Sequence, residues 1–148
     1  MKPKEPRFTP LLKYKSFIED TMRQEMLNEA EKLALEEKRI FALEEIWSQA
    51  VEELKERQTR KGDPNEILMY HTYLNHLSLD IDSQRKRVIE AMERFNEKRE
   101  YLIEATKERK IVEKVVEKGK KGMLDDANRE EKKVMNETAQ NRYLRDNC

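Results

Sequence analysis

The chain has 148 residues, of which 42% are charged and 36% hydrophobic, and its 31 basic side chains balance its 31 acidic ones. So polar a composition excludes a thick globular core, while the balanced charge excludes both the high-net-charge composition of disordered chains and a long-range attraction to nucleic acid or anionic lipid. The many Glu, Lys, Arg, Leu and Ala residues favour long, solvent-exposed helices, so we expect an all-α protein that binds no nucleic acid.

The amino-terminal stretch "MKPKEPRFTP" is interrupted by prolines. We expect residues 1–9 to be a flexible segment, with Thr9 as the cap and Pro10 as the first residue of a long helix that runs to Lys61. No stretch has the apolar run of a signal peptide or the roughly 18 apolar residues of a membrane span, and the single cysteine, Cys148, has no internal partner. We therefore expect a soluble chain of the reducing cytoplasm.

Apolar residues mark one face of this first predicted helix. Toward its end they follow alternating steps of three and four, at Ile40, Leu43, Trp47, Ala50 and Leu54. Nearer the amino end they include successive steps of four, at Leu11, Tyr14, Ile18, Met22, Met26, Ala30 and Leu33. Such steps relax a left-handed supercoil, so we expect straighter helices there.

The stretch "RKGDPNE", residues 60–66, holds the only proline after Pro10 and one of the three glycines. Gly62 is expected to take the left-handed conformation that closes the first helix, beside the basic Arg60 and Lys61. Asp63 can cap a second helix with Pro64 at its first position, and Glu66 has the spacing of a capping box. A helix end followed so closely by the beginning of another helix predicts a helical hairpin.

The second predicted helix carries a coiled-coil seam of fifteen residues in alternating steps of three and four: Ile67, Tyr70, Leu74, Leu77, Ile81, Gln84, Val88, Ala91, Phe95, Lys98, Leu102, Ala105, Arg109, Val112 and Val116. The pattern predicts an antiparallel coiled-coil hairpin over residues 10–118, in which the numbers of facing residues add up to about 127. This rule sets Leu11 opposite Val116, brings Trp47 near Ile81, and brings Glu29 near Lys98.

The seam ends before "GKKG", residues 119–122, where the first helix has no residues left to pair. Two glycines disfavour a helix, and the residues that follow have only scattered apolar side chains. We therefore expect residues 119–148 to be a helical or frayed tail, less ordered than the hairpin, which a partner could order.

Charge differs between the two predicted helices. Residues 19–56 carry a net charge of −7, and residues 106–122 carry +4. Complementarity between the two arms is the simpler interpretation, yet the basic run also offers candidate partner-binding residues: Lys107, Lys110, Lys114, Lys118, Lys120 and Lys121.

The sequence offers no catalytic, metal or cofactor site. "GKKG" lacks the Ser or Thr and the preceding strand of a phosphate-binding loop, and His71 and His76 are five residues apart, a spacing that does not place them on one helix face. Two helices also form no cleft for acid–base chemistry. We expect a protein that is not an enzyme and binds no cofactor and no small-molecule substrate.

Apolar residues that lie off the seam are candidates for binding partners, and they concentrate in the half of the hairpin near the turn. They are Phe41, Ile46 and Val51 in the first helix, and Leu68, Met69, Tyr73 and Leu79 in the second. Some of them can widen the seam, as Ile46 and Val51 flank Trp47. Tyr73 and Leu79 are harder to explain in this way and suggest a helical partner.

Three stretches resemble the FliJ family of flagellar type III export proteins, across nearly the whole chain. They are "RFTPLLKYKSFIEDTMRQEM", "FNEKREYLIEATKERK" and "EEKKVMNETAQNR". Their order is more specific than any one of them: a basic and aromatic start, a helical hairpin, and an ending Lys-Lys-x-Met-x-Glu-x-Ala at Lys132, Lys133, Met135, Glu137 and Ala139. Asn136 stands where the family tends to have an acidic residue.

The resemblance implies a stalk that inserts in the hexameric export ATPase, engages the export-gate membrane protein, and assists substrate-specific export chaperones. It implies a place at the cytoplasmic face of the inner membrane and a shape similar to the rotor stalk of rotary ATPases. It also makes Tyr73 and Leu77 look like positions that face the gate, and Glu137 and Ala139 like family positions of the ending. Three alternatives stay open: the stalk of a virulence-type injectisome, the stalk of a rotary ATPase, and a structural coiled coil that self-associates.

Overall fold

The computed structural model describes residues 6–60 and 62–146. It contains two helices, α1 (Thr9–Thr59) and α2 (Pro64–Asp146), and the prediction of an all-α helical hairpin is confirmed. The chain divides into two units. We call Thr21–Leu102 the hairpin unit, and Met1–Asp20 together with Ile103–Cys148 the terminal unit, and each is described by itself.

The turn between the helices is held by backbone and capping hydrogen bonds. The Gly62 N–H donates to the carbonyl of Arg57 at 3.0 Å, and a Cβ added at Gly62 would lie 3.0 Å from that same oxygen. Close approach to this carbonyl is therefore the structural reason for a glycine here. Asp63 caps α2 as predicted, because its Oδ1 accepts the Asn65 N–H at 3.0 Å, and Pro64 is the first residue of the helix.

Two details of the predicted turn differ in the structure. Glu66 does not complete a capping box: it binds Arg57 across the turn at 2.8 Å. The expectation for Lys61 beside the end of α1 lies outside the described residues.

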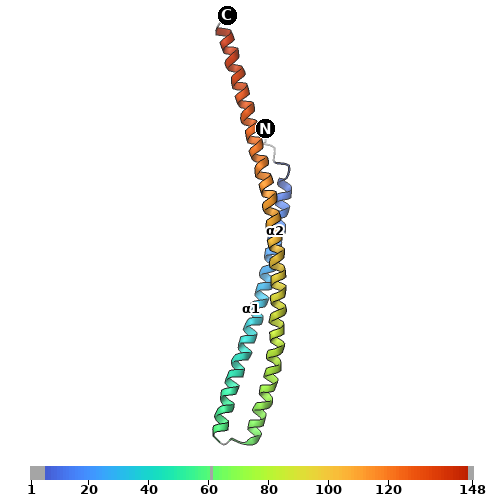
Figure 1. Ribbon diagram of the computed structural model, residues 1–148, viewed down its shortest axis with the longest axis vertical. Helices are drawn as coiled ribbons and strands as arrows, with labels where there is room; N and C mark the ends of the chain where they lie inside the picture. Colours follow the sequence, from blue (N-terminus) through green and yellow to red (C-terminus); the bar gives the residue numbers. More distant parts are fainter. Residues whose placement is uncertain (1–5, 61, 147–148) are drawn as a thin grey trace. The chain divides into compact units, whose positions relative to one another are not determined.

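In the hairpin unit α1 and α2 lie side by side and antiparallel, joined by this turn (Figure 1). Its core cluster consists of Ala50, Leu54, Leu74 and Leu77, against which Leu43, Trp47, Val51, Ile67 and Tyr70 pack. These are seam positions of both helices, apart from Val51, which widens the seam as expected. The seam prediction is thus confirmed where the apolar pattern is strongest.

All fifteen seam positions predicted in the second helix are buried or half-buried in α2. The cross-helix pairs of this unit do not share one sum of residue numbers, however: Glu36 with Gln84 gives 120, and Glu44 with Arg85 gives 129. The pairs Glu25 with Lys98, Glu29 with Arg94, and Glu53 with Tyr70 have residue numbers that add up to 123, not 127. The predicted encounter of Glu29 with Lys98 is not the one that forms, because Glu29 binds Arg94 and Lys98 binds Glu25.

In the terminal unit the predicted face of α1 is wrong at Leu11 and Tyr14, although Ile18 is half-buried as predicted. Leu11 and Tyr14 are 39% and 58% exposed, whereas Leu12 and Lys15 are half-buried and Glu19 is buried. These three positions continue alternating steps of three and four, so no run of four-residue steps interrupts the packing in this unit. Leu11 is correspondingly not the buried partner of Val116 that the register rule had predicted.

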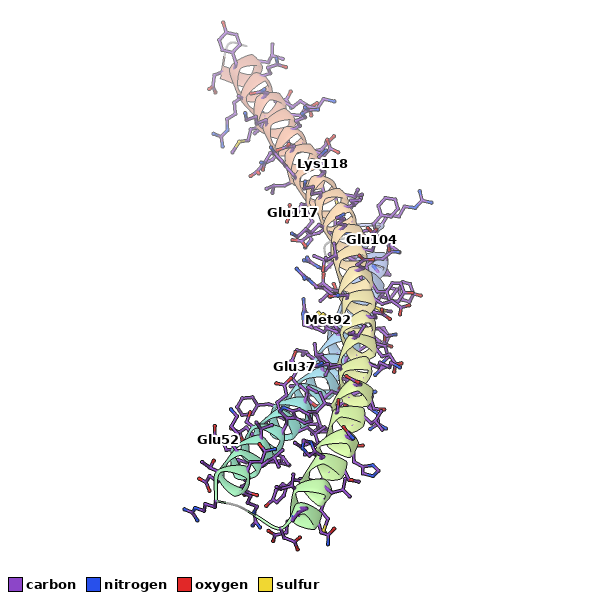
Figure 2. All side chains as sticks on the ribbon, turned by 60° about the horizontal axis from the view of Figure 1, so that its bottom comes forward. Glu37, Glu52, Met92, Glu104, Glu117 and Lys118 are labelled. Atoms are coloured by element: carbon purple, nitrogen blue, oxygen red, sulfur yellow. The ribbon has the colours of Figure 1, made fainter. Side chains whose placement is uncertain are left out.

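In the same unit α2 continues as one helix through Gly119 and Gly122 to Asp146. All residues from 117 to 146 are exposed, and we call this segment the tail. Figure 2 shows side chains, among them those of Glu117 and Lys118, standing out from the helix around the start of the tail. The residues before α1 pack beside the start of the tail. A Cβ added at Gly119 would lie 3.6 Å from the Cβ of the buried Pro6.

Replacement of a glycine by alanine should have opposite effects on stability at Gly122 and at Gly62. Replacement of Gly122 by Ala should stabilise the tail helix by about 0.5–1 kcal/mol, since alanine is the better helix former and no atom lies within 4 Å of the added Cβ. Gly62→Ala should destabilise the hairpin by about 1 kcal/mol through the clash with the Arg57 carbonyl. Amide hydrogen exchange over residues 117–146 measures the first effect, and urea unfolding measures the second. Faster exchange in Gly122→Ala would contradict the prediction.

Candidate partner-binding surfaces

Gln84 places a polar layer in the seam of the hairpin unit. It is buried, and its Nε2 donates both to the backbone carbonyl of Glu36 at 3.0 Å and to the Glu36 carboxylate. Lys98 lies farther along the seam and binds Glu25 at 3.2 Å, a hydrogen bond that raises the pKa of Lys98 above its ordinary value. Polar seam pairs of this kind favour one register over its neighbours.

A second charged layer lies in the terminal unit. The Arg109 Nε donates to the buried Glu19 carboxylate at 2.6 Å, and the same guanidinium binds Glu113 on its own helix. The hydrogen bond with Glu19 raises the pKa of Arg109. Lys15 adds an ion pair with Glu108 at 2.9 Å. In the pairs of Glu19 with Arg109 and Glu25 with Lys98, α1 supplies the acid and α2 the base, whereas Lys15 with Glu108 and Arg57 with Glu66 have the reverse arrangement.

We predict strong coupling between Glu19 and Arg109. Each single alanine variant leaves the other charge at the seam without its main partner, so the double variant should lose less thermal stability than the two single variants combined. The exposed pair Glu104 and Lys107, 3.7 Å apart on one helix, is the control and should give a coupling near zero. Melting curves of the complete double-mutant cycles provide the measurement. Additive losses at Glu19 and Arg109 would contradict this prediction.

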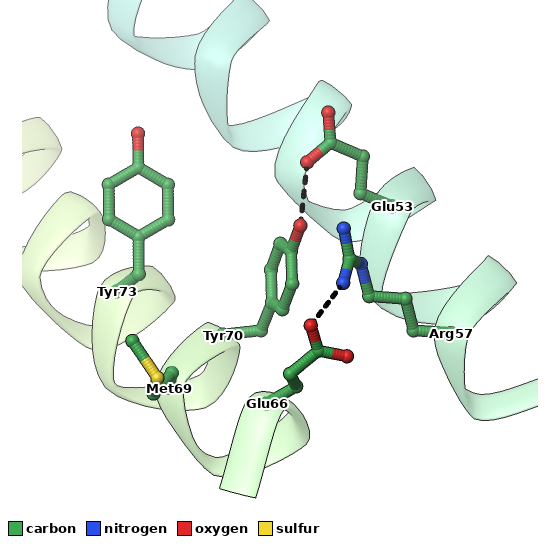
Figure 3. A pocket seen from close by; sticks show the side chains of 6 residues that line it. All are labelled: Glu53, Arg57, Glu66, Met69, Tyr70 and Tyr73. Carbon is green, nitrogen blue, oxygen red and sulfur yellow. Dashed lines mark hydrogen bonds and ion pairs between the residues drawn. The ribbon is translucent and has the colours of Figure 1, made fainter. Parts of the chain in front are cut away.

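The turn end of the hairpin unit has an open depression lined by Glu53, Arg57, Glu66, Met69, Tyr70 and Tyr73. Figure 3 shows Tyr70 between the two helices, with its hydroxyl toward Glu53 and its ring beside Arg57. The hydroxyl donates to Glu53 at 3.0 Å, which raises the pKa of Tyr70, and the Arg57 guanidinium lies 5.1 Å from the ring centre. Tyr70 is thus held in place, while Tyr73 remains 48% exposed at the rim.

The other candidate residues of the hairpin unit do not join this depression. Leu77 is only 6% exposed and belongs to the core cluster, so its side chain is structural. Phe41 is exposed and lines a separate shallow hollow with Glu44, Glu45, Ser48 and Gln49. Leu79 is exposed and lines neither hollow. Sequence reasoning missed Arg57 and Glu53, because their role depends on the turn that brings them to Tyr70.

Leu77 and Tyr73 therefore differ in their expected effect on stability. Leu77→Ala should lower the free energy of unfolding by about 2–4 kcal/mol, because it opens a cavity in the core cluster. Tyr73→Ala should change it by no more than about 0.5 kcal/mol, as is usual for exposed side chains outside special contacts. Urea unfolding followed by circular dichroism distinguishes the two. An equal loss in both variants would show that Tyr73 also supports the fold.

The six candidate lysines of the basic run are all exposed, and Lys107 also contacts Glu104. At about 100° per residue, Lys107, Lys110, Lys114, Lys118 and Lys121 fall within an arc of about 80° on one face of α2. We call these five residues the lysine stripe. The seam residues Ala105, Arg109, Val112 and Val116 lie on the opposite face of the helix, so the stripe points away from α1. Lys120 lies outside the stripe.

The tail carries the remaining candidates. Glu137 and Ala139 are both exposed, and Ala139 lines a shallow hollow with Gln140, Tyr143 and Leu144. In the described part of the chain no charged side chain after Glu113 forms an ion pair, although the tail is rich in both signs of charge. The tail thus presents charges and apolar side chains that the protein itself leaves unused.

Over residues 6–60 and 62–146, no His, Cys, Asp or Glu residues group in a way that could hold a metal ion. Neither of the two described helices combines the length and the apolar character that crossing a membrane requires. The family model described as "Flagellar FliJ protein" matches residues 3–147. No curated protein and no solved structure matches the chain significantly.

Proposed function

Because the chain belongs to the FliJ family of flagellar proteins, we propose that it couples the hexameric export ATPase to the export-gate membrane protein and assists substrate-specific export chaperones. The family is associated with the flagellar export apparatus, and its members are non-catalytic components. The coupling role, the three partners and a location at the cytoplasmic face of the inner membrane are the finer statements that we propose.

The lysine stripe is the observation that carries this proposal. Five lysines on one face of α2, followed by the exposed tail, form a basic surface that points away from α1. Such a surface suits an acidic binding site that surrounds a helix, as the inside of an ATPase ring does. We therefore assign the stripe and the tail to the ATPase.

The turn end of the hairpin unit suits a different partner. Its exposed side chains Leu68, Met69 and Tyr73 are apolar or aromatic, and Tyr73 borders a depression whose floor is fixed by Tyr70 and Arg57. Such a rigid, partly apolar surface favours binding of a helix or an extended segment. We assign it to the export gate, with Tyr73 as the principal contact.

This division predicts separable defects. Removal of residues 119–148, or the triple change Lys110→Glu, Lys114→Glu and Lys118→Glu, should abolish stimulation of ATP hydrolysis, because both remove the assigned ring-binding surface. Tyr73→Ala should spare stimulation but weaken binding to the gate and reduce motility. Hydrolysis assays, co-elution with each partner and swimming tests measure these effects.

A matched control has the same change in charge on α1, at the exposed residues Lys13, Lys38 and Lys55. This variant should stimulate hydrolysis normally, and circular dichroism must show intact helix in every variant. Full stimulation by the chain without residues 119–148 would reverse the assignment of the two ends. If the natural chain neither stimulates nor co-elutes with the ATPase and instead forms dimers, it is a self-associating structural coiled coil.

A further inference from the structure

The outer face of α1 in the hairpin unit carries a second helical pattern, besides the one that packs against α2. It starts at Leu27 and proceeds in alternating steps of four and three, which is the spacing of a coiled-coil seam. We call its members the outer stripe: Leu27, Glu31, Ala34, Lys38, Phe41 and Glu45. All six are exposed.

Helix geometry places this stripe away from α2. At about 100° per residue its members fall within an arc of about 80°, and the seam residues Leu33, Glu36 and Ile40 lie on the opposite face of α1. Leu27 and Phe41 are 47% and 62% exposed. The packing of α1 against α2 therefore does not account for the apolar side chains of the stripe.

Leu35 widens the apolar part of the stripe. It follows Glu31 by four residues and precedes Lys38 by three, so its side chain neighbours both, and it is 49% exposed. The stripe is about 27 Å long from Leu27 to Glu45, which equals about five turns of a second helix. One helix of ordinary length can thus cover all of it.

The charge around Phe41 is mainly negative. Glu37, Glu44 and Glu45 lie three or four residues from it and therefore neighbour its side chain. Together with Glu31 they give four acids against the single base Lys38, a net charge of −3. Glu44 reaches Arg85 at 3.7 Å, whereas over residues 6–60 and 62–146 the acids Glu31, Glu37 and Glu45 form no ion pair.

A shallow hollow adds a place for a basic side chain. It is lined by Phe41, Glu44, Glu45, Ser48 and Gln49, so an aromatic ring lies beside two carboxylates. A lysine or arginine can lay its apolar stem on such a ring while its charged end reaches the carboxylates. The hollow thus favours a partner with basic side chains.

We propose that the outer stripe binds one basic amphipathic helix of a partner protein, which packs along α1 as a third helix. The apolar side chains of that helix cover Leu27, Leu35 and Phe41, and its lysines or arginines meet the unpaired acids. A second copy that presented the same stripe would bring like charges together, which disfavours self-association through this face. The proposal does not rest on the function proposed above, since the stripe lies outside both surfaces assigned there.

Binding of a designed peptide to the full-length chain tests this proposal. The probe is a fluorescent three-heptad helical peptide with leucine at positions a and d and lysine at the flanking positions e and g, and a second peptide has glutamate in place of each lysine. The lysine peptide should bind at least about tenfold more tightly than the glutamate peptide. Raising NaCl from about 0.05 M to about 0.5 M should weaken its binding, because salt screens the exposed charges.

Variants locate the binding to the stripe. Leu27→Gln, Leu35→Gln and Phe41→Gln together should weaken binding of the lysine peptide by about tenfold, because they remove its apolar contacts. The matched control changes three exposed apolar residues of α2 to glutamine, and it should alter binding by less than about threefold. The control residues are Leu79, Ile89 and Met92.

A charge pair of variants separates the role of the acids. Glu31→Gln with Glu45→Gln should weaken binding of the lysine peptide by about fivefold and reduce its salt dependence. The control Glu90→Gln with Glu93→Gln removes two exposed acids of α2 and should change binding by less than about twofold.

The proposal is overturned if neither peptide binds, if both bind alike, or if a control loses as much as its matched stripe variant while circular dichroism shows intact helix in both. Sedimentation of the natural chain covers the remaining occupant: dimers that the triple stripe variant dissolves would make a second copy the partner and would also overturn it. Failure of the proposed function is a separate result, because the peptide assay contains neither the ATPase nor the gate.

Discussion

A helix that packs against a single partner buries only the residues at alternating steps of three and four, and this constraint governs the protein. In both units the buried positions of α1 and α2 follow such steps, and most positions between them face solvent. The core is therefore one residue layer thick. Each seam residue matters for stability, whereas most of the remaining surface is free to bind other molecules.

A thin apolar seam alone specifies its register poorly, since sliding by one heptad buries a similar set of side chains. The polar layers correct this weakness. In the hairpin unit Gln84 reaches both the backbone and the side chain of Glu36, and in the terminal unit Arg109 meets the buried Glu19. A slipped register would leave these groups buried without partners, which is costlier than the loss of an apolar contact.

The same polar layers explain which parts of the fold could be predicted from the sequence. The α2 seam was predicted at every position because only three of its fifteen residues are polar. On α1 the seam includes the charged residues Lys15, Glu19, Glu29 and Glu36. A search for apolar residues therefore does not select these seam positions. Following Leu11 and Tyr14 instead produced the wrong face in the terminal unit.

The candidate sites were predictable to different degrees. The exposure of Tyr73, Leu79 and Phe41 followed from their positions off the seam. The depression at the turn did not, because it depends on Arg57 and Glu66 meeting across the turn and on Tyr70 reaching Glu53. Those contacts join residues on different helices, and their separation in the sequence does not match the repeat of a helix or a strand. The structure also showed that the lysines of the basic run, except Lys120, share one face of α2.

The tail has a different energetic basis from the rest of α2. Its residues 117–146 are helical but all exposed, so they lack the packed apolar face from which most helical stability in proteins comes. Gly119 and Gly122 weaken the helix further at its junction with the seam. Helix formation in the tail therefore depends on local backbone and side-chain interactions rather than on burial. A partner that bound the exposed side chains of the tail would stabilise this helix and be positioned by it, because binding and helix formation would then be coupled.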